Sequence, residues 1–166
     1  MRPTFRLTAA LLLAAATVAS AQPPAAPAPA DALPIYDTTS VGALAIEAAS
    51  RAAAESGRRL LVNFGTNDCA PCRTFNDAVF EEPFETAFFG QFVPVFVDVA
   101  PGSPNRDLLA RYGIDPSRGF PAVVLSDDQL RIGETTKAGE LVAVSAAGKE
   151  AVREWLLKRF RKEAPR

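Results

Sequence analysis

The 166-residue sequence contains no histidine, and this absence excludes several classes of chemistry. Ser-His-Asp catalysis, Cys-His catalysis, histidine metal ligands and histidine charge switching near neutral pH all require that side chain. An excess of positive charge is also missing, since 18 Lys and Arg residues stand against 19 Asp and Glu. Because a nucleic-acid-binding protein must neutralise phosphates with a basic surface, we expect no nucleic-acid partner.

Cysteine is scarce, with two residues in the whole chain, Cys69 and Cys72. Two thiols without histidine fall short of the four ligands that zinc usually requires, so we expect no metal site. With 48% hydrophobic residues, the chain can build a core without relying on disulfides. A static disulfide across this short loop would stabilise the fold by only about 2 kcal/mol. The Cys-x-x-Cys spacing therefore favours a redox role, with a static disulfide or a thiol-bound metal as alternatives.

The first 21 residues are typical of a secretory signal peptide. Arg2 and Arg6 supply the positive start, residues 7–18 form an apolar run, and residues 19–21 (Ala-Ser-Ala) form the small-residue cleavage site. The apolar run is shorter than the about 20 residues of a membrane-spanning helix, although an uncleaved anchor is the alternative. We therefore expect an exported, periplasmic protein with no stable membrane insertion after signal cleavage.

A tract rich in proline and alanine follows the predicted signal peptide. Proline fixes the backbone φ angle and lacks an N–H donor, so this tract is expected to be an extended tether rather than part of a core. We therefore predict a linker over residues 22–36 and one domain over residues 37–166.

Hydrophobic patterning over the domain predicts an α/β fold, with a mixed sheet between helices. Pro94 lacks the N–H that a central strand needs, so its strand is expected at a sheet edge or a bulge. Asp127 and Asp128 are expected to form a hairpin turn. The expected helices cover 41–56, 70–79, 83–89, 105–112 and 147–161, and the expected strands cover 60–64, 92–99, 121–126 and 129–133.

The two cysteines lie where a strand is expected to lead into a helix. At a helix N-terminus, unpaired N–H groups and the helix dipole stabilise negative charge, which lowers the pKa of a thiol. Cys69 is therefore predicted to be the attacking thiol, and Cys72, one helical turn later, the resolving thiol. Pro71 suits the first turn of the helix. The neighbouring charges act in opposite directions on a Cys69 thiolate, since Asp68 disfavours it and Arg73 favours it.

Residues 61–73, with the sequence LVNFGTNDCAPCR, resemble the active-site strand, loop and helix of the thioredoxin superfamily. Residues 92–99, 109–114 and 119–125 match later elements of that family in order, so the similarity covers roughly residues 40–162. The chain is most similar to exported thioredoxin-like proteins. The resemblance implies a thioredoxin-like fold with four to five strands, and thiol–disulfide exchange with protein substrates and a redox partner protein. No dissociable cofactor is implied beyond the redox-active disulfide.

The resemblance also assigns roles to residues far from the cysteines. It implies that Pro121 is a cis-proline facing the disulfide and that Phe120 shapes a groove in which a substrate strand pairs with the backbone. Two positions depart from the family. Asp68 stands where thioredoxins usually have tryptophan, and Asn63 stands where they have a buried acid. An amide cannot accept a proton from Cys72, so that step needs water or another group.

These observations predict an exported thiol–disulfide oxidoreductase. The Ala70-Pro71 pair resembles the Gly-Pro pair of reducing thioredoxins, which favours a reductase. One alternative is a non-catalytic binding module that uses the groove near Phe120 and keeps a permanent disulfide. Another is a protein that handles Cu(I) between its two thiolates, which are soft ligands.

Overall fold

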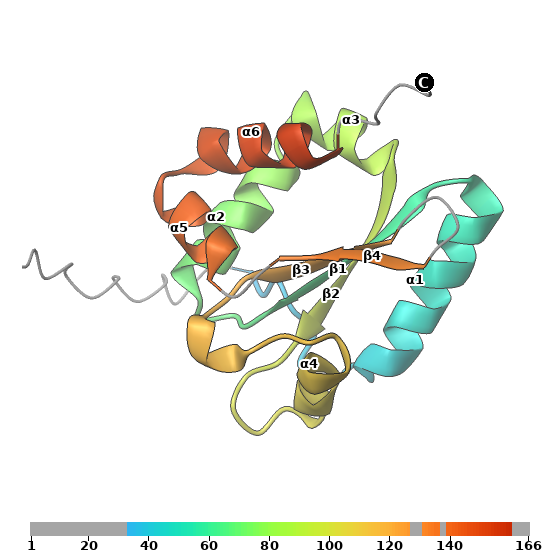
Figure 1. The fold of residues 1–166 in the computed structure, drawn as a ribbon, viewed down its shortest axis with the longest axis vertical. Helices are drawn as coiled ribbons and strands as arrows, with labels where there is room; N and C mark the ends of the chain where they lie inside the picture. The colour runs from blue at the N-terminus through green and yellow to red at the C-terminus, as the bar shows by residue number, and fades with distance from the viewer. Residues whose placement is uncertain (1–32, 127–130, 137–138, 161–166) are drawn as a thin grey trace, which may run out of the picture.

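The computed structural model describes residues 33–126, 131–136 and 139–160. The expected signal peptide, most of the expected linker and the turn expected at Asp127 and Asp128 lie outside these residues. The described chain forms a sheet with helices on both faces (Figure 1). Its elements, in chain order, are α1 (Gly42–Ser56), β1 (Arg59–Gly65), α2 (Ala70–Val79), α3 (Phe84–Phe89), β2 (Phe92–Asp98), the 3-10 helix η1 (Pro104–Arg106), α4 (Asp107–Arg111), the 3-10 helix η2 (Pro116–Arg118), β3 (Ala122–Ser126), β4 (Ile132–Thr135), α5 (Glu140–Ala146) and α6 (Lys149–Phe160).

The sheet has four strands in the order β2-β1-β3-β4. β1 pairs in parallel with β2, and the connection between them runs through α2 and α3. β3 pairs antiparallel with both β1 and β4, so the last two strands form the expected antiparallel pair. The mixed sheet between helices confirms the predicted α/β fold.

Pro94 lies in β2, at one edge of the sheet. An edge strand uses backbone donors on one side only, so the missing N–H of proline is tolerated there. The prediction of an edge position is therefore confirmed. β1, by contrast, is a central strand, and its residues from Leu60 to Gly65 are all buried.

Helices cover both faces of the sheet (Figure 1), and an apolar layer lies between the helices and the sheet on each face. Leu60, Val62 and Phe64 of β1 pack in the layer with α1 and α4, whereas Leu61 packs in the layer with α2, α3, α5 and α6. Because side chains alternate along a strand, Asn63 and Gly65 lie on the α2 face together with Leu61.

β2 shows the same alternation. Val97 and Val99 belong to the α1 layer and Phe92 belongs to the α2 layer. Asp98 therefore lies on the α2 face, next to Gly65, its partner in the parallel register. Polar positions of two neighbouring strands thus meet on the face that carries the cysteine helix.

α5 was not expected from the sequence. Val142 and Val144 are β-branched residues with low helix propensity, which weakens the local signal. The helix is fixed by packing instead, because Leu141 is fully buried in the α2 layer. Among the described residues, no helix is long and apolar enough to cross a membrane.

Candidate active site

Cys69 and Cys72 are joined by a disulfide at the N-terminus of α2. Cys69 is the N-cap residue, and its Sγ accepts a hydrogen bond from the backbone N–H of Cys72 at 3.1 Å. Pro71 lies in the first turn of the helix, as expected from its missing donor. The first cysteine therefore occupies the position where the N–H groups of a helix stabilise negative charge.

The two cysteines differ in exposure. Cys69 is partly exposed, whereas Cys72 is completely buried beneath the first turn of α2. Ala70 and Pro71, between them, are also partly exposed. A disulfide or thiol from outside can therefore reach Cys69 and not Cys72.

The segment before β3 lies against the disulfide. Cys69 Sγ is 3.4 Å from the carbonyl oxygen of Phe120, and the Phe120–Pro121 peptide bond is cis. A disulfide sulfur carries no proton, so this is a van der Waals contact in the oxidised protein. In a reduced protein, a Cys69 thiol could donate to the same carbonyl. Phe120 is partly exposed and Pro121 is buried.

The two charged neighbours of the cysteines bond to the surrounding loop. Asp68 is exposed and accepts a hydrogen bond from the Thr66 hydroxyl at 2.5 Å. Arg73 donates to the carbonyl oxygen of Asn67 at 2.7 Å and to that of Leu33 at 3.4 Å. Arg73 thus connects α2 with the cysteine loop, residues 66–69 between β1 and α2, and with the N-terminal segment, residues 33–41.

Asn67 holds the N-terminal segment against the active-site loop. Its Oδ1 accepts from the backbone N–H groups of Ile35 at 2.8 Å and Tyr36 at 3.0 Å. Its Nδ2 donates to the Tyr36 carbonyl at 2.9 Å. These three hydrogen bonds satisfy backbone groups of a segment that has no regular secondary structure to pair them. The chain therefore enters the domain beside the cysteine loop.

Tyr36 is part of the core, with 1% of its surface exposed. From composition alone this residue falls at the end of the predicted linker, because proline and alanine residues dominate the preceding stretch. The signal that could have located it is the change to Pro34-Ile35-Tyr36, where two bulky apolar side chains follow each other. Tyr36 is thus a site residue that sequence reasoning missed.

Gly65 lies between Tyr36 and Cys72. A Cβ atom at this position would overlap the Tyr36 hydroxyl and lie 3.0 Å from Cys72 Sγ. Both groups therefore meet above the same backbone atom of β1, and only glycine leaves room for them. The Tyr36 hydroxyl donates to Asn63 Oδ1 at 3.2 Å.

Behind the buried cysteine lies a polar cluster formed by Tyr36, Asn63 and Asp98. Asn63 is completely buried and Asp98 is 2% exposed. Within the described part of the chain, neither Asn63 Nδ2 nor Asp98 Oδ1 has a hydrogen-bond partner. Burial, followed by the charge of Asp98, raises the pKa of Tyr36 above its usual range, so its hydroxyl stays protonated.

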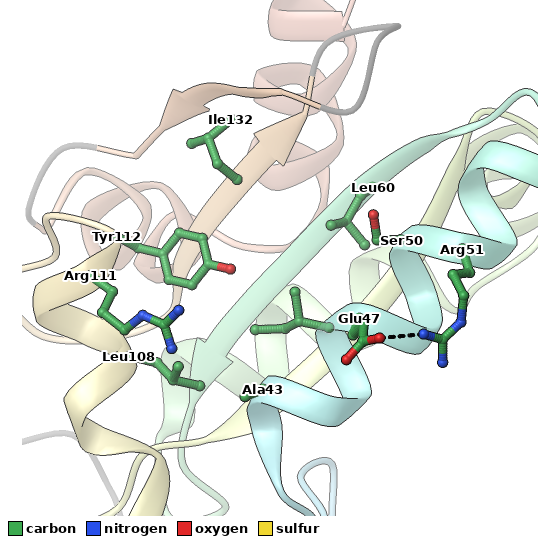
Figure 2. A pocket seen from close by; sticks show the side chains of 10 residues that line it. Ala43, Glu47, Ser50, Arg51, Leu60, Leu108, Arg111, Tyr112 and Ile132 are labelled. Carbon is green, nitrogen blue, oxygen red and sulfur yellow. Dashed lines mark hydrogen bonds and ion pairs between the residues drawn. The ribbon is translucent and has the colours of Figure 1, made fainter.

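A cavity of about 460 Å³ lies on the α1 side of the sheet, on the face opposite to the disulfide (Figure 2). Its walls combine apolar side chains such as Leu60 and Leu108 with polar ones such as Tyr112. A Glu47–Arg51 ion pair spans one turn of α1 at its rim. The cavity contains neither cysteine and is separated from them by the sheet, so it is not part of the dithiol site.

A mixed sheet between helices, with a Cys-x-x-Cys disulfide at the start of α2, defines a protein of the thioredoxin type. A family model described as thioredoxin-like matches residues 42–127, more than half of the 166-residue chain. The chain therefore belongs to the thioredoxin-like family. Among curated proteins, no relative matches it significantly.

Solved structures show the same similarity. A disulphide isomerase from Xylella fastidiosa Temecula1 is 26% identical, with a TM-score of 0.69, over 76% of this chain and 97% of the other. The C-terminal domain of Neisseria meningitidis DsbD in the oxidised form is 19% identical, with a TM-score of 0.45, over 70% and 99%. A thioredoxin from Thermus thermophilus is 18% identical, with a TM-score of 0.44, over 71% and 94%.

Proposed function

We propose that this protein is an exported thiol–disulfide oxidoreductase that exchanges disulfides with protein substrates through Cys69 and Cys72. The observation that carries the proposal is the 3.1 Å hydrogen bond from the Cys72 N–H to Cys69 Sγ, at the first turn of α2. A backbone donor and the positive end of the helix dipole stabilise a thiolate, which is the nucleophile in exchange. Cys69 is accordingly the attacking thiol, and the buried Cys72 is the resolving thiol.

The exchange proceeds in two steps. The Cys69 thiolate attacks a substrate disulfide, forming a bond to one substrate sulfur while the other leaves as a thiolate. Cys72, after losing its proton, attacks Cys69, which restores the intramolecular disulfide and releases the second substrate thiolate. The protein has then given two electrons to the substrate, and a redox partner protein must reduce it again. The reverse sequence oxidises a substrate dithiol.

The substrate is proposed to bind beside Phe120 and Pro121. The Phe120 carbonyl already lies 3.4 Å from Cys69 Sγ, so a strand laid along this backbone brings its own cysteine to the reacting sulfur. Main-chain pairing of this kind tolerates many sequences, which suits an enzyme that acts on proteins.

Reduction is the proposed direction. Ala70 and Pro71 between the cysteines add no histidine or cation that would stabilise the reduced form further, unlike the pair found in strong oxidants. The similar Xylella fastidiosa protein is a disulphide isomerase, which supports disulfide chemistry in this chain. Export is supported by Arg2, Arg6 and the apolar run that follows.

The proposal is tested by reduction of insulin driven by dithiothreitol. We expect wild-type protein to accelerate the reaction and Cys69→Ser to abolish the acceleration. When reduced Cys72→Ser is mixed with insulin without dithiothreitol, it should accumulate a covalent complex with the substrate, visible by mass spectrometry, because no second thiol resolves the mixed disulfide. Asp77→Asn, on the exposed face of α2, serves as a control with unchanged activity.

The alternatives give different results in the same set of proteins. A binding module would not accelerate insulin reduction, and Cys69→Ser would leave its binding intact. A copper-handling protein would bind Cu(I) stoichiometrically when reduced and would not accelerate insulin reduction. Its Cys69→Ser variant would no longer bind Cu(I).

A further inference from the structure

The second step of the proposed exchange requires Cys72 to lose a proton inside the protein. Cys72 is completely buried, so bulk water does not reach its sulfur. Asn63, on the same face of the sheet, carries an amide and cannot accept the proton. A different group must therefore take it.

Asp98 is a buried carboxylate on the same face of the sheet as Cys72. Gly65, against which Cys72 Sγ packs, is paired in the parallel register with Asp98 on β2. Neighbouring strands lie about 4.8 Å apart. The Asp98 side chain therefore leaves the backbone of β2 directly beside Gly65, the residue of β1 against which Cys72 Sγ packs. Its Oδ1 is buried and has no hydrogen-bond partner in the described chain.

An unpaired buried carboxylate oxygen is costly for a fold, and a catalytic role is one physical reason for such an atom. The other members of the cluster do not satisfy it. The Tyr36 hydroxyl donates to Asn63 Oδ1, at 3.2 Å, and not to Asp98. No donor among the described residues thus occupies Asp98 Oδ1.

We propose that Asp98 is the proton acceptor for Cys72 during resolution of the mixed disulfide, and that Tyr36 positions the two groups. In this step the proton passes from the Cys72 thiol to the Asp98 carboxylate, directly or through one water molecule. The resulting thiolate attacks Cys69, the bond between Cys69 and the substrate breaks, and the substrate leaves as a thiolate. The inference rests on the proposed function.

Charged groups also lie on the elements next to this cluster. Arg106 of η1 donates to the Val99 carbonyl at 2.8 Å, next to Asp98, and Arg73 of α2 donates to the Asn67 carbonyl. Asp68 lies on the exposed side of the cysteine loop. Among these groups, Asp98 and Asp68 are the carboxylates, and Asp98 is the one buried on the Cys72 side.

The test is a stopped-flow reaction of the fully reduced protein with 5,5′-dithiobis(2-nitrobenzoate). Attack by Cys69 on the reagent releases the first coloured thiolate, at a rate that depends on reagent concentration. Attack by Cys72 on the resulting mixed disulfide releases the second coloured thiolate, at a rate that is independent of reagent concentration. We expect Asp98→Asn to leave the first phase unchanged and to slow the second at least about tenfold at pH 7, since general bases typically contribute more than this.

A pH profile separates a proton acceptor from a structural residue. In Asp98→Asn, the second phase depends on unassisted ionisation of Cys72. Its rate should therefore rise about tenfold per pH unit below the thiol pKa. In the wild-type protein, the rate of the second phase should rise less steeply with pH. Asn63→Asp combined with Asp98→Asn returns a carboxylate to the same face and should restore the fast second phase. Asp77→Asn, which removes an exposed acid from α2, should resemble wild type.

The outcomes are distinguishable. An unchanged second phase and pH profile in Asp98→Asn would overturn the inference while leaving the proposed function intact. A slow Asp98→Asn that the double variant does not restore would also overturn it, because the loss would then be structural. Failure of the first phase in wild-type protein would instead contradict the proposed function.

Discussion

At the scale of single residues, the site depends on close packing between three groups around β1. Tyr36, Gly65 and Cys72 meet at one point, where the glycine has no side chain to separate the tyrosine hydroxyl from the buried sulfur. Cys72 is therefore held between β1, through Gly65 and Tyr36, and the first turn of α2, to which it belongs. Small changes at these positions should therefore affect stability directly.

Gly65→Ala places a Cβ atom against the Tyr36 hydroxyl and 3.0 Å from Cys72 Sγ. Overpacking of a buried site typically costs about 1–3 kcal/mol, so we expect the free energy of unfolding to fall by that amount. Urea denaturation of the oxidised protein measures it. A loss below about 0.5 kcal/mol, within the range of neutral surface changes, would show that the contact is not tight.

Tyr36→Phe removes the hydroxyl and leaves the buried Asn63 side chain without that donor. A buried acceptor that loses its partner costs about 1–3 kcal/mol. We expect a loss in this range by urea denaturation, against less than about 0.5 kcal/mol for Tyr112→Phe, whose ring lines the open cavity on the α1 side. Equal losses in the two variants would argue against a specific role for the Tyr36 hydroxyl.

At the scale of elements, side chains from loops connect segments that are far apart in the sequence. Asn67, in the cysteine loop, holds residues 35 and 36, and Glu81, after α2, forms ion pairs with Lys149 at 2.8 Å and Arg153 at 2.5 Å on α6. The Asn67 hydrogen bonds keep the N-terminal segment beside the cysteine loop. The Glu81 ion pairs connect the end of α2 with α6.

Asn67→Ala removes three hydrogen bonds to the N-terminal segment. We expect the backbone amides of Ile35 and Tyr36 to exchange with deuterium much faster, while those of β1 stay protected. Hydrogen exchange followed by mass spectrometry gives this comparison. Unchanged exchange at Ile35 and Tyr36 would mean that the burial of the tyrosine ring alone holds the segment.

Hydrogen bonds and ion pairs with Lys149 and then Arg153 lower the pKa of Glu81. A carboxylate whose pKa is lower in the folded state stabilises it above the unfolded pKa, and this contribution disappears as the pH falls through the folded pKa. We therefore expect Glu81→Gln to be less stable than wild type at pH 7, and the difference to vanish as the pH falls well below about 4, the ordinary range of glutamate.

Glu55→Gln, on the exposed end of α1, provides the control for this comparison, because no ion pair of Glu55 is found among the described residues. It should match wild type at both pH values. A Glu81→Gln protein whose stability relative to wild type does not change with pH would contradict the role assigned to these ion pairs.

Several elements could be predicted from the sequence because their signals are local. The apolar run of β1, the proline at the edge in β2 and the Cys-x-x-Cys at the start of α2 each follow from residue type and spacing. α5 could not be predicted, since its β-branched residues favour other structures and only the burial of Leu141 fixes it.

The site was predictable only in part for a related reason. The cysteines and the Phe120-Pro121 segment carry recognisable patterns. Tyr36 and Asp98 do not, because their importance arises from strand register and from a segment that folds back over the sheet. Contacts of this kind depend on tertiary structure and leave little trace in local sequence.

At the scale of the whole molecule, the fold separates two faces with different properties. The α2 face carries the disulfide and the buried polar cluster in addition to its apolar layer, whereas the α1 face carries an apolar layer, against which the Phe120 side chain packs, and the open cavity. The disulfide therefore lies on one face only, where Cys69 is accessible from outside and Cys72 is not.

We propose that Cys69 and Cys72 form a redox-active pair that works as a reductant. The reduction potential of the pair, from titration with dithiothreitol or glutathione and mass-tagging of free thiols, decides between the possible directions. For a reductant we expect about −270 mV, as in thioredoxin, reached with the domain folded. A value of about −120 mV would make the protein an oxidant, and a disulfide that is reduced only on unfolding would contradict a redox role.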